Sequence, residues 1–197
     1  MYRNYFVEVP VRDEDGNQTG TQEGQTAAHQ IDNIFEVSKA IGNIPNYQYF
    51  EMTNGYTISS YAGLSMLTKK LESLDREAIK AELRVGVQAD CQVTSTSWGE
   101  DLINDPTHTC TQIFVSACSC SYSPKTDKEQ WAPFASLILE ASYEATLWAA
   151  VIHALKHKDD PRARVVFLCL VGGGVFGNDL NWIKDAINMA IERVEPA

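Results

Sequence analysis

RVVFLCLV, residues 164–171, runs directly into GGGVFGN, residues 172–178, and this stretch decides the fold. Its first half is rich in β-branched and other apolar residues, which is typical of a strand buried on both faces of a sheet. The glycines that follow predict a tight loop, and residues 179–193 then have the apolar periodicity of a helix. The order predicted here is a strand, a glycine-rich loop and a closing helix.

A long helix is predicted upstream of this strand, from about residue 130 to residue 157, because apolar side chains recur there at helical spacing. Before it, TQIFVSA at residues 111–117 predicts a second buried strand. A strand, a helix and another strand in this order favour a parallel pair joined by a crossover. The sequence therefore predicts an α/β fold class.

The first half of the chain predicts shorter elements. They are a helix at residues 26–42, a strand at 47–52, and helices that begin near Ser60 and Asp75. Residues 12–25 are polar and acidic and predict a loop, so residues 1–25 are expected to be partly irregular. The length of 197 residues favours one domain, spanning residues 1–197.

The charge of the chain restricts its partners. There are 16 lysine and arginine residues against 26 aspartate and glutamate residues, which gives a formal net charge of −10. A broad surface that neutralises phosphates is therefore not expected, and neither nucleic acid nor an anionic membrane is a predicted partner. No apolar run approaches the ~20 residues that a membrane span requires. Any anionic ligand would have to be held locally.

The five cysteines are an odd number, and the sequence starts without the basic and apolar pattern of a secretion signal. Together these features favour reduced thiols and a location in the cytoplasm or another reducing compartment. Cys118 and Cys120 are too close in sequence for the usual zinc-ligand spacing. His153 and His157 are four residues apart on the long predicted helix and share a face, but no third ligand is near them in sequence. The sequence predicts no metal site and no cofactor.

The glycine loop at residues 172–178 lies where a buried strand would meet the start of a helix. Ligands of α/β proteins bind at this end of the strands, and exposed amides beside a helix N-terminus favour a phosphate or pyrophosphate. Gly174 is expected to have a positive φ, and a side chain there would occupy the phosphate position. The alternative interpretation is a tight turn whose glycines only allow close packing, and the loop matches neither GxGxxG nor GxxxxGK[ST].

Residues 141–194 resemble the C-terminal part of macro domains. In that family a helix and an apolar strand precede a loop of the form small-Thr-Gly-Val/Ile-Phe/Tyr-Gly, which wraps the diphosphate and distal ribose of ADP-ribose. Gly173 stands here at the Thr position, and residues 174–177 match the rest of the loop. The resemblance implies a three-layer macro-domain-like fold with a largely parallel or mixed central sheet, and it implies ADP-ribose or an ADP-ribosylated protein as partner.

The first half of the chain departs from the usual macro-domain pattern, since it has no Asn-Ala-Ala-Asn turn and no glycine-rich loop. FEMTNGY at 50–56, LRVGVQADCQVT at 83–94 and FVSACSCSYS at 114–123 instead resemble a divergent branch, that of MavL-type ADP-ribosyl hydrolases. This resemblance implies removal of ADP-ribose from a modified protein. It also implies that the chain lacks an N-terminal part of the fold.

Hydrolysis of an ADP-ribosyl bond needs a carboxylate near the distal ribose to activate water or orient the hydroxyls. Asp90 is the first candidate because it follows a short predicted strand, and Asp101 on the adjoining loop is the second. A solvated or turn carboxylate is the alternative for each. The predicted ligand-binding residues are Gly172, Gly173, Gly174, Val175, Phe176, Gly177, Asn178, Tyr122 and Asn54.

Two other functions remain open. The chain would be a non-catalytic reader of ADP-ribose or a related nucleotide if it has the loop but no competent carboxylate, and an interaction protein if the loop is only structural. Asn178 reflects the same choice, since its amide could bind a ribose hydroxyl or the residue could adopt a left-handed turn conformation.

Overall fold

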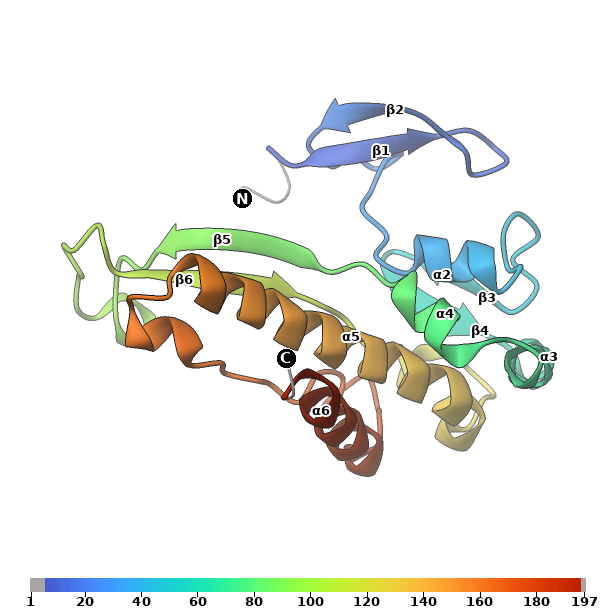
Figure 1. Ribbon diagram of the computed structural model, residues 1–197. Coiled ribbons are helices and arrows are strands. Elements are labelled where there is room, and N and C mark those ends of the chain that lie inside the picture. The colour runs from blue at the N-terminus through green and yellow to red at the C-terminus, as the bar shows by residue number, and fades with distance from the viewer. Residues whose placement is uncertain (1–5, 196–197) are drawn as a thin grey trace.

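The computed structural model describes residues 6–195, and these form a mixed α and β structure (Figure 1). The strands are β1 (Glu8–Arg12), β2 (Gln18–Glu23), β3 (Phe50–Thr53), β4 (Tyr56–Ser59), β5 (Gly86–Gln92) and β6 (Thr109–Phe114). The α-helices are α2 (Phe35–Ala40), α3 (Tyr61–Glu72), α4 (Arg76–Ala81), α5 (Lys128–Lys156) and α6 (Leu180–Val194). Short 3₁₀ turns are η1 (Ser97–Gly99), η2 (Cys120–Tyr122) and η3 (Pro161–Arg164).

Helix α5 organises the molecule, as Figure 1 shows. It begins at a capping box in which Asp127 and Gln130 satisfy each other's backbone amides. Its N-terminal half packs with α3 and α4 around Trp131 and Phe134, and α6 runs against its middle, where Leu139 and Tyr143 meet Ile183. The predicted long helix is therefore confirmed, and it joins the two apolar clusters of the core.

The same helix is long and apolar enough, by length and composition, to cross a membrane. The expectation that no segment would meet this criterion is thus wrong for α5. However, 44% of its most apolar window is buried inside the protein, which fits the core helix of a soluble protein.

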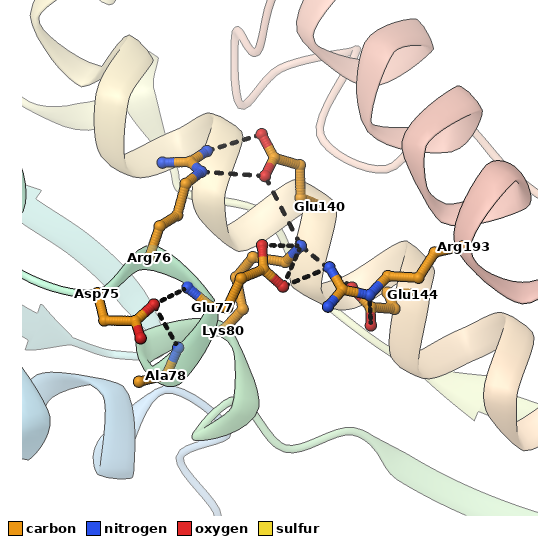
Figure 2. A network of polar contacts seen from close by, with 8 residues as sticks. All are labelled: Asp75, Arg76, Glu77, Ala78, Lys80, Glu140, Glu144 and Arg193. Carbon is orange, nitrogen blue, oxygen red and sulfur yellow. Dashed lines mark hydrogen bonds and ion pairs between the residues drawn. The ribbon is translucent and has the colours of Figure 1, made fainter.

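A buried lysine links α4 to α5. The Lys80 side chain is only 5% exposed, and its Nζ lies 3.1 Å from Glu77 Oε1, 3.1 Å from Glu144 Oε2 and 4.0 Å from Glu140 Oε2 (Figure 2). Glu77 lies on α4 beside Lys80, whereas Glu140 and Glu144 lie on α5. Because a buried ammonium is stable only when it is paired, the two carboxylates of α5 fix the position of α4 on that helix.

Two arginines extend this network, as Figure 2 shows. Arg76 binds both oxygens of Glu140, with Nη2 to Oε1 at 2.7 Å and Nε to Oε2 at 3.2 Å. Arg193 reaches from α6 to Glu77 and to Glu144, the latter at 3.1 Å. Burial opposes ionisation of Glu77, but the hydrogen bonds from Lys80 and Arg193 hold the pKa of its carboxyl below the usual value.

The strands form three separate antiparallel hairpins, β1–β2, β3–β4 and β5–β6. The α/β class is confirmed at this level, but the parallel pair predicted from residues 111–117 and 164–171 is not formed among the described residues. Residues 165–170 have no regular secondary structure and Val171 lies in a turn, and Phe167 is 93% exposed. The physical reason is that β6 pairs with β5, while an open cavity of about 620 Å³ lies among β6, α5 and residues 165–171.

The predictions for residues 12–25 and 26–42 are each wrong in part. The predicted loop at residues 12–25 is wrong in part because β2 pairs with β1, across a turn in which the Asp13 carboxylate accepts hydrogen bonds from the amides of Asp15 and Asn17. The helix predicted at residues 26–42 is limited to α2, because residues 26–34 form turns and irregular backbone.

Candidate functional site

The glycine loop, residues 172–178, is tied to the segment that precedes α5. The amide of Asn178 donates to Gly172 O at 3.0 Å, which closes the loop. The buried Asn178 side chain donates through Nδ2 to Cys118 O at 2.7 Å, and the amide of Ser121 donates to Phe176 O at 3.0 Å. Asn178 does not have a positive φ, so the left-handed turn is not its role.

Backbone conformation or close packing explains why three of the four loop positions are glycine. Gly172 and Gly177 have φ values of 77° and 74°, and a Cβ at these positions would collide with Ala117 and Ser121 respectively. At Gly173 a Cβ would lie 3.1 Å from a methyl group of Ile183. These three glycines therefore permit the turn and its close packing, as the structural interpretation of the loop predicts.

Gly174 is different. Its φ is not positive, so the expectation of a positive φ at this glycine is wrong. A Cβ there would meet nothing within 4 Å. Neither backbone conformation nor packing among the described residues explains why this position is a glycine.

The backbone amides at the tip of the loop are available to a ligand. Among the described residues, no hydrogen bond uses the N–H groups of Gly174, Val175 or Phe176. The first turn of the 15-residue helix α6 follows, and Asp179 caps it by accepting from the amide of Asn181 at 2.9 Å. Successive free amides next to a helix N-terminus form the kind of concave donor surface that binds anions.

Three aromatic rings lie beside these amides. Tyr56, at the start of β4, Tyr122, in η2, and Phe176 contact one another with centroid distances of 4.9, 5.9 and 5.5 Å. Tyr56 is 38% exposed and Tyr122 40% exposed, so the cluster presents ring surface to solvent. Asn54 is exposed in the β3–β4 turn, two residues before Tyr56, with a φ of 51°. The structure thus brings Tyr122 and the loop together.

The two predicted catalytic carboxylates do not join them. Asp90 lies on β5 and contacts Lys156 and His157 at the C-terminal end of α5, whereas the loop region contacts α5 at Tyr143. At 1.5 Å rise per residue these points on the helix are roughly 20 Å apart. Asp101 is exposed in the β5–β6 connection, where its carboxylate accepts from Thr96 Oγ1 at 3.4 Å.

A different carboxyl group lies near the loop, and sequence reasoning missed it. Asp32 lines a cavity of about 210 Å³ together with Ala117 and Cys118, the residues that contact Gly172 and Asn178. Burial raises the pKa of Asp32, although a hydrogen bond from the amide of Ile34 acts in the opposite direction. The sequence predicts a helix over residues 26–42, which would contain Asp32. The backbone is irregular at this residue instead, and Asp32 lines the cavity.

The cysteines near the loop are not activated nucleophiles. Burial raises the pKa of the Cys118 thiol well above its usual value and that of Cys120 to about 12. All five cysteines of the chain are free.

The larger cavity, of about 620 Å³, runs along α5 from Tyr143 to His157 and is also lined by residues of β6 and of the segment 165–171. Apolar side chains line most of it, and His153, His157 and Arg162 lie at one end.

In comparisons with protein families, with curated proteins and with solved structures, nothing matched this chain.

Proposed function

We propose that this chain is a macro-like protein that binds ADP-ribose, with the diphosphate held by the tip of the glycine loop. The observation that carries the proposal is Gly174, which no feature of the described fold requires to be a glycine, next to three consecutive amides without partners. A ligand phosphate that approaches the backbone closely would explain both. The resemblance of residues 141–194 to macro domains supports the same assignment.

The surroundings of the loop suit the rest of such a ligand. The exposed faces of Tyr56 and Tyr122 offer a surface on which a ribose or an adenine ring can pack. The Oδ1 atom of Asn178 is buried and has no hydrogen-bond partner among the described residues, so it has the capacity to accept a hydrogen bond from a hydroxyl group. A protein of net charge −10 must hold an anion by such local donors.

The proposal extends to the architecture. A helix, an irregular apolar segment, a glycine loop and a closing helix follow one another from α5 to α6, in the order that macro domains have. In a three-layer arrangement with a mixed central sheet, residues 165–171 would be the strand that leads into the loop. The cytoplasmic location and the absence of nucleic acid and membrane partners remain parts of this proposal.

Titration calorimetry with ADP-ribose tests the binding site. The parent protein should bind ADP-ribose, and Gly174→Val should weaken binding by at least roughly tenfold, since the new side chain occupies the ligand position without straining the backbone. Gly20→Val is the matched control, because Gly20 also has open space around it and no positive φ. Equal affinity in a folded Gly174→Val variant would show that the loop is structural.

A second candidate function, hydrolysis of an ADP-ribosyl bond, is favoured by Asp32. A carboxyl group whose pKa is raised by burial, beside a cavity, is a candidate for proton transfer. Release of ADP-ribose from arginine-linked and acid-linked substrates should fall by on the order of 10²-fold or more in Asp32→Asn, while ADP-ribose affinity changes less. Asp15→Asn, in an exposed turn, is the control.

The outcomes of this experiment separate the alternatives. If the parent protein binds ADP-ribose but releases none from either substrate, it is a reader. If Asp90→Asn loses turnover and Asp32→Asn does not, the catalytic carboxylate is Asp90, as the sequence predicted.

A further inference from the structure

Three potential metal ligands meet at the C-terminal end of α5, away from the glycine loop. His153 and His157 lie one turn apart on the helix, and their ring centroids are 4.5 Å apart. Asp90 reaches them from β5, 63 residues or more away in sequence. One ligand atom from each of the three side chains lies within 4.8 Å of the others.

Asp90 and His157 are in close polar contact. Asp90 Oδ1 and His157 Nε2 are 2.8 Å apart, yet both atoms are buried and neither has a hydrogen-bond partner among the described residues. When His157 is protonated, the two atoms form an ion pair across this distance, and a divalent cation between them would take the place of that proton. Ligand atoms of a tetrahedral zinc ion, each about 2.1 Å from the metal, are roughly 3.4 Å apart, so only a small adjustment is needed.

Neighbouring groups hold the three side chains in place. Thr111 Oγ1 accepts a hydrogen bond from the amide of Asp90 at 3.3 Å and lies 3.0 Å from His153 Nδ1, so one hydroxyl links two of the three residues and leaves His153 Nε2 available. Asp90 itself has a φ of 54° at a break in the β5–β6 register, which turns its side chain toward α5. Hydrogen bonds to the side chains that bind a metal orient those side chains in known metal sites.

We propose that Asp90, His153 and His157 form a binding site for a divalent transition-metal ion of the Zn²⁺ class. Two imidazoles and one carboxylate are a ligand set used by zinc and by other first-row metals, and three protein ligands leave a coordination position open. Both histidines line the 620 Å³ cavity, so the open position faces a space that a small molecule with an electron-pair donor can enter.

Lys156 contacts one of the proposed ligands directly, whereas Arg162, which lines the same cavity, is paired with Asp160. The Nζ of Lys156 is 2.5 Å from Asp90 Oδ2, the carboxylate oxygen that does not face His157. The Lys156 side chain is 60% exposed, so it can remain on Oδ2 or move into solvent when a metal binds to Oδ1. Its positive charge opposes metal binding, and its removal should therefore strengthen the affinity.

The experiment uses the full chain, without a histidine tag, and measures Zn²⁺ and Co²⁺ binding by competition with a chromophoric chelator. The parent protein should bind one ion. Asp90→Asn, His153→Gln and His157→Gln should each weaken binding by roughly 10- to 100-fold or more, and Thr111→Val by about tenfold. Lys156→Met should bind more tightly than the parent. Nitrogen NMR of the imidazoles should show metal-dependent shifts for His153 and His157, an observation that a loss of folding cannot imitate.

Matched variants control for other metal-binding groups. His108→Gln removes a histidine that lines the same cavity but is outside the cluster, and Cys91→Ser with Cys110→Ser removes the thiols paired across β5 and β6. Affinity should be unchanged in both. The proposal is overturned if the parent protein binds no ion, if the cysteine variant alone abolishes binding, or if the NMR signals of His153 and His157 do not respond to bound metal.

Discussion

Gly177 and Gly174 differ in what a side chain would meet, and this difference predicts opposite effects on stability. Gly177 has a positive φ and is packed on Ser121, whereas Gly174 has neither constraint. Gly177→Ala should therefore lower the free energy of unfolding by roughly 1–3 kcal/mol. Gly174→Ala should leave it unchanged or raise it by up to about 1 kcal/mol. Urea denaturation of the two variants measures this contrast, and equal values for both would contradict the loop geometry.

At the same scale, single residues were predicted well where the signal is local. The glycine-rich segment forms a turn directly before α6, as the local sequence predicts, although the buried strand expected before it is not formed. The partners of Asp90 could not be predicted in the same way, because they lie on a helix more than 60 residues later in the chain. Spacing along the sequence identifies two histidines on one helix face, but only tertiary structure brings a third ligand to them.

Among the helices, the buried Lys80 predicts how α4 is held on α5. Lys80→Met would leave the Glu77, Glu140 and Glu144 carboxylates close together without their central cation, so the free energy of unfolding should fall by about 3–5 kcal/mol. Lys128→Met is the control, since Lys128 forms an exposed pair with Asp179 and its removal should change stability far less.

The effect of Lys80→Met on the free energy of unfolding should depend on pH in one direction. Glu77 has a lowered pKa in the folded protein, so its contribution to stability is present above its unfolded pKa and is lost as the pH falls through the folded value. The difference between the parent and Lys80→Met should accordingly be largest near neutral pH and shrink in acid. A difference that grows as the pH falls would contradict the assigned network.

The starts of helices in this chain could be predicted from the sequence, whereas the pairing of strands could not. Ser60 caps α3 by accepting from the amide of Gly63 at 3.1 Å, and Asp75 caps α4, both as predicted, because these bonds form within one turn. Residues 165–171 have the composition of a buried strand, but a strand needs a partner elsewhere in the chain. The expected partner, β6, is paired with β5 instead. Composition shows the tendency of a segment and not whether a neighbour is present.

For the molecule as a whole, α5 connects two regions with different character. The core around its N-terminal half is closely packed and joined by the ion-pair network, whereas its C-terminal half borders the open cavity and residues 165–171. The proposed ADP-ribose site lies beside the first region and the proposed metal site at the end of the second. The two proposals therefore concern different parts of one helix and can fail independently.

Amide hydrogen exchange across the chain tests this division. Among the described residues, no hydrogen bond uses the amides of residues 166–170, so these amides should exchange nearly as fast as those of an unfolded chain. The amides paired in β5 and β6 serve as the internal control and should exchange more slowly. Strong protection of residues 166–170 would mean that this segment pairs as a strand in solution, as its sequence predicts. Saturating ADP-ribose should slow exchange at residues 174–176 without changing β5 or β6, since the proposed ligand would occupy the amides at the loop tip.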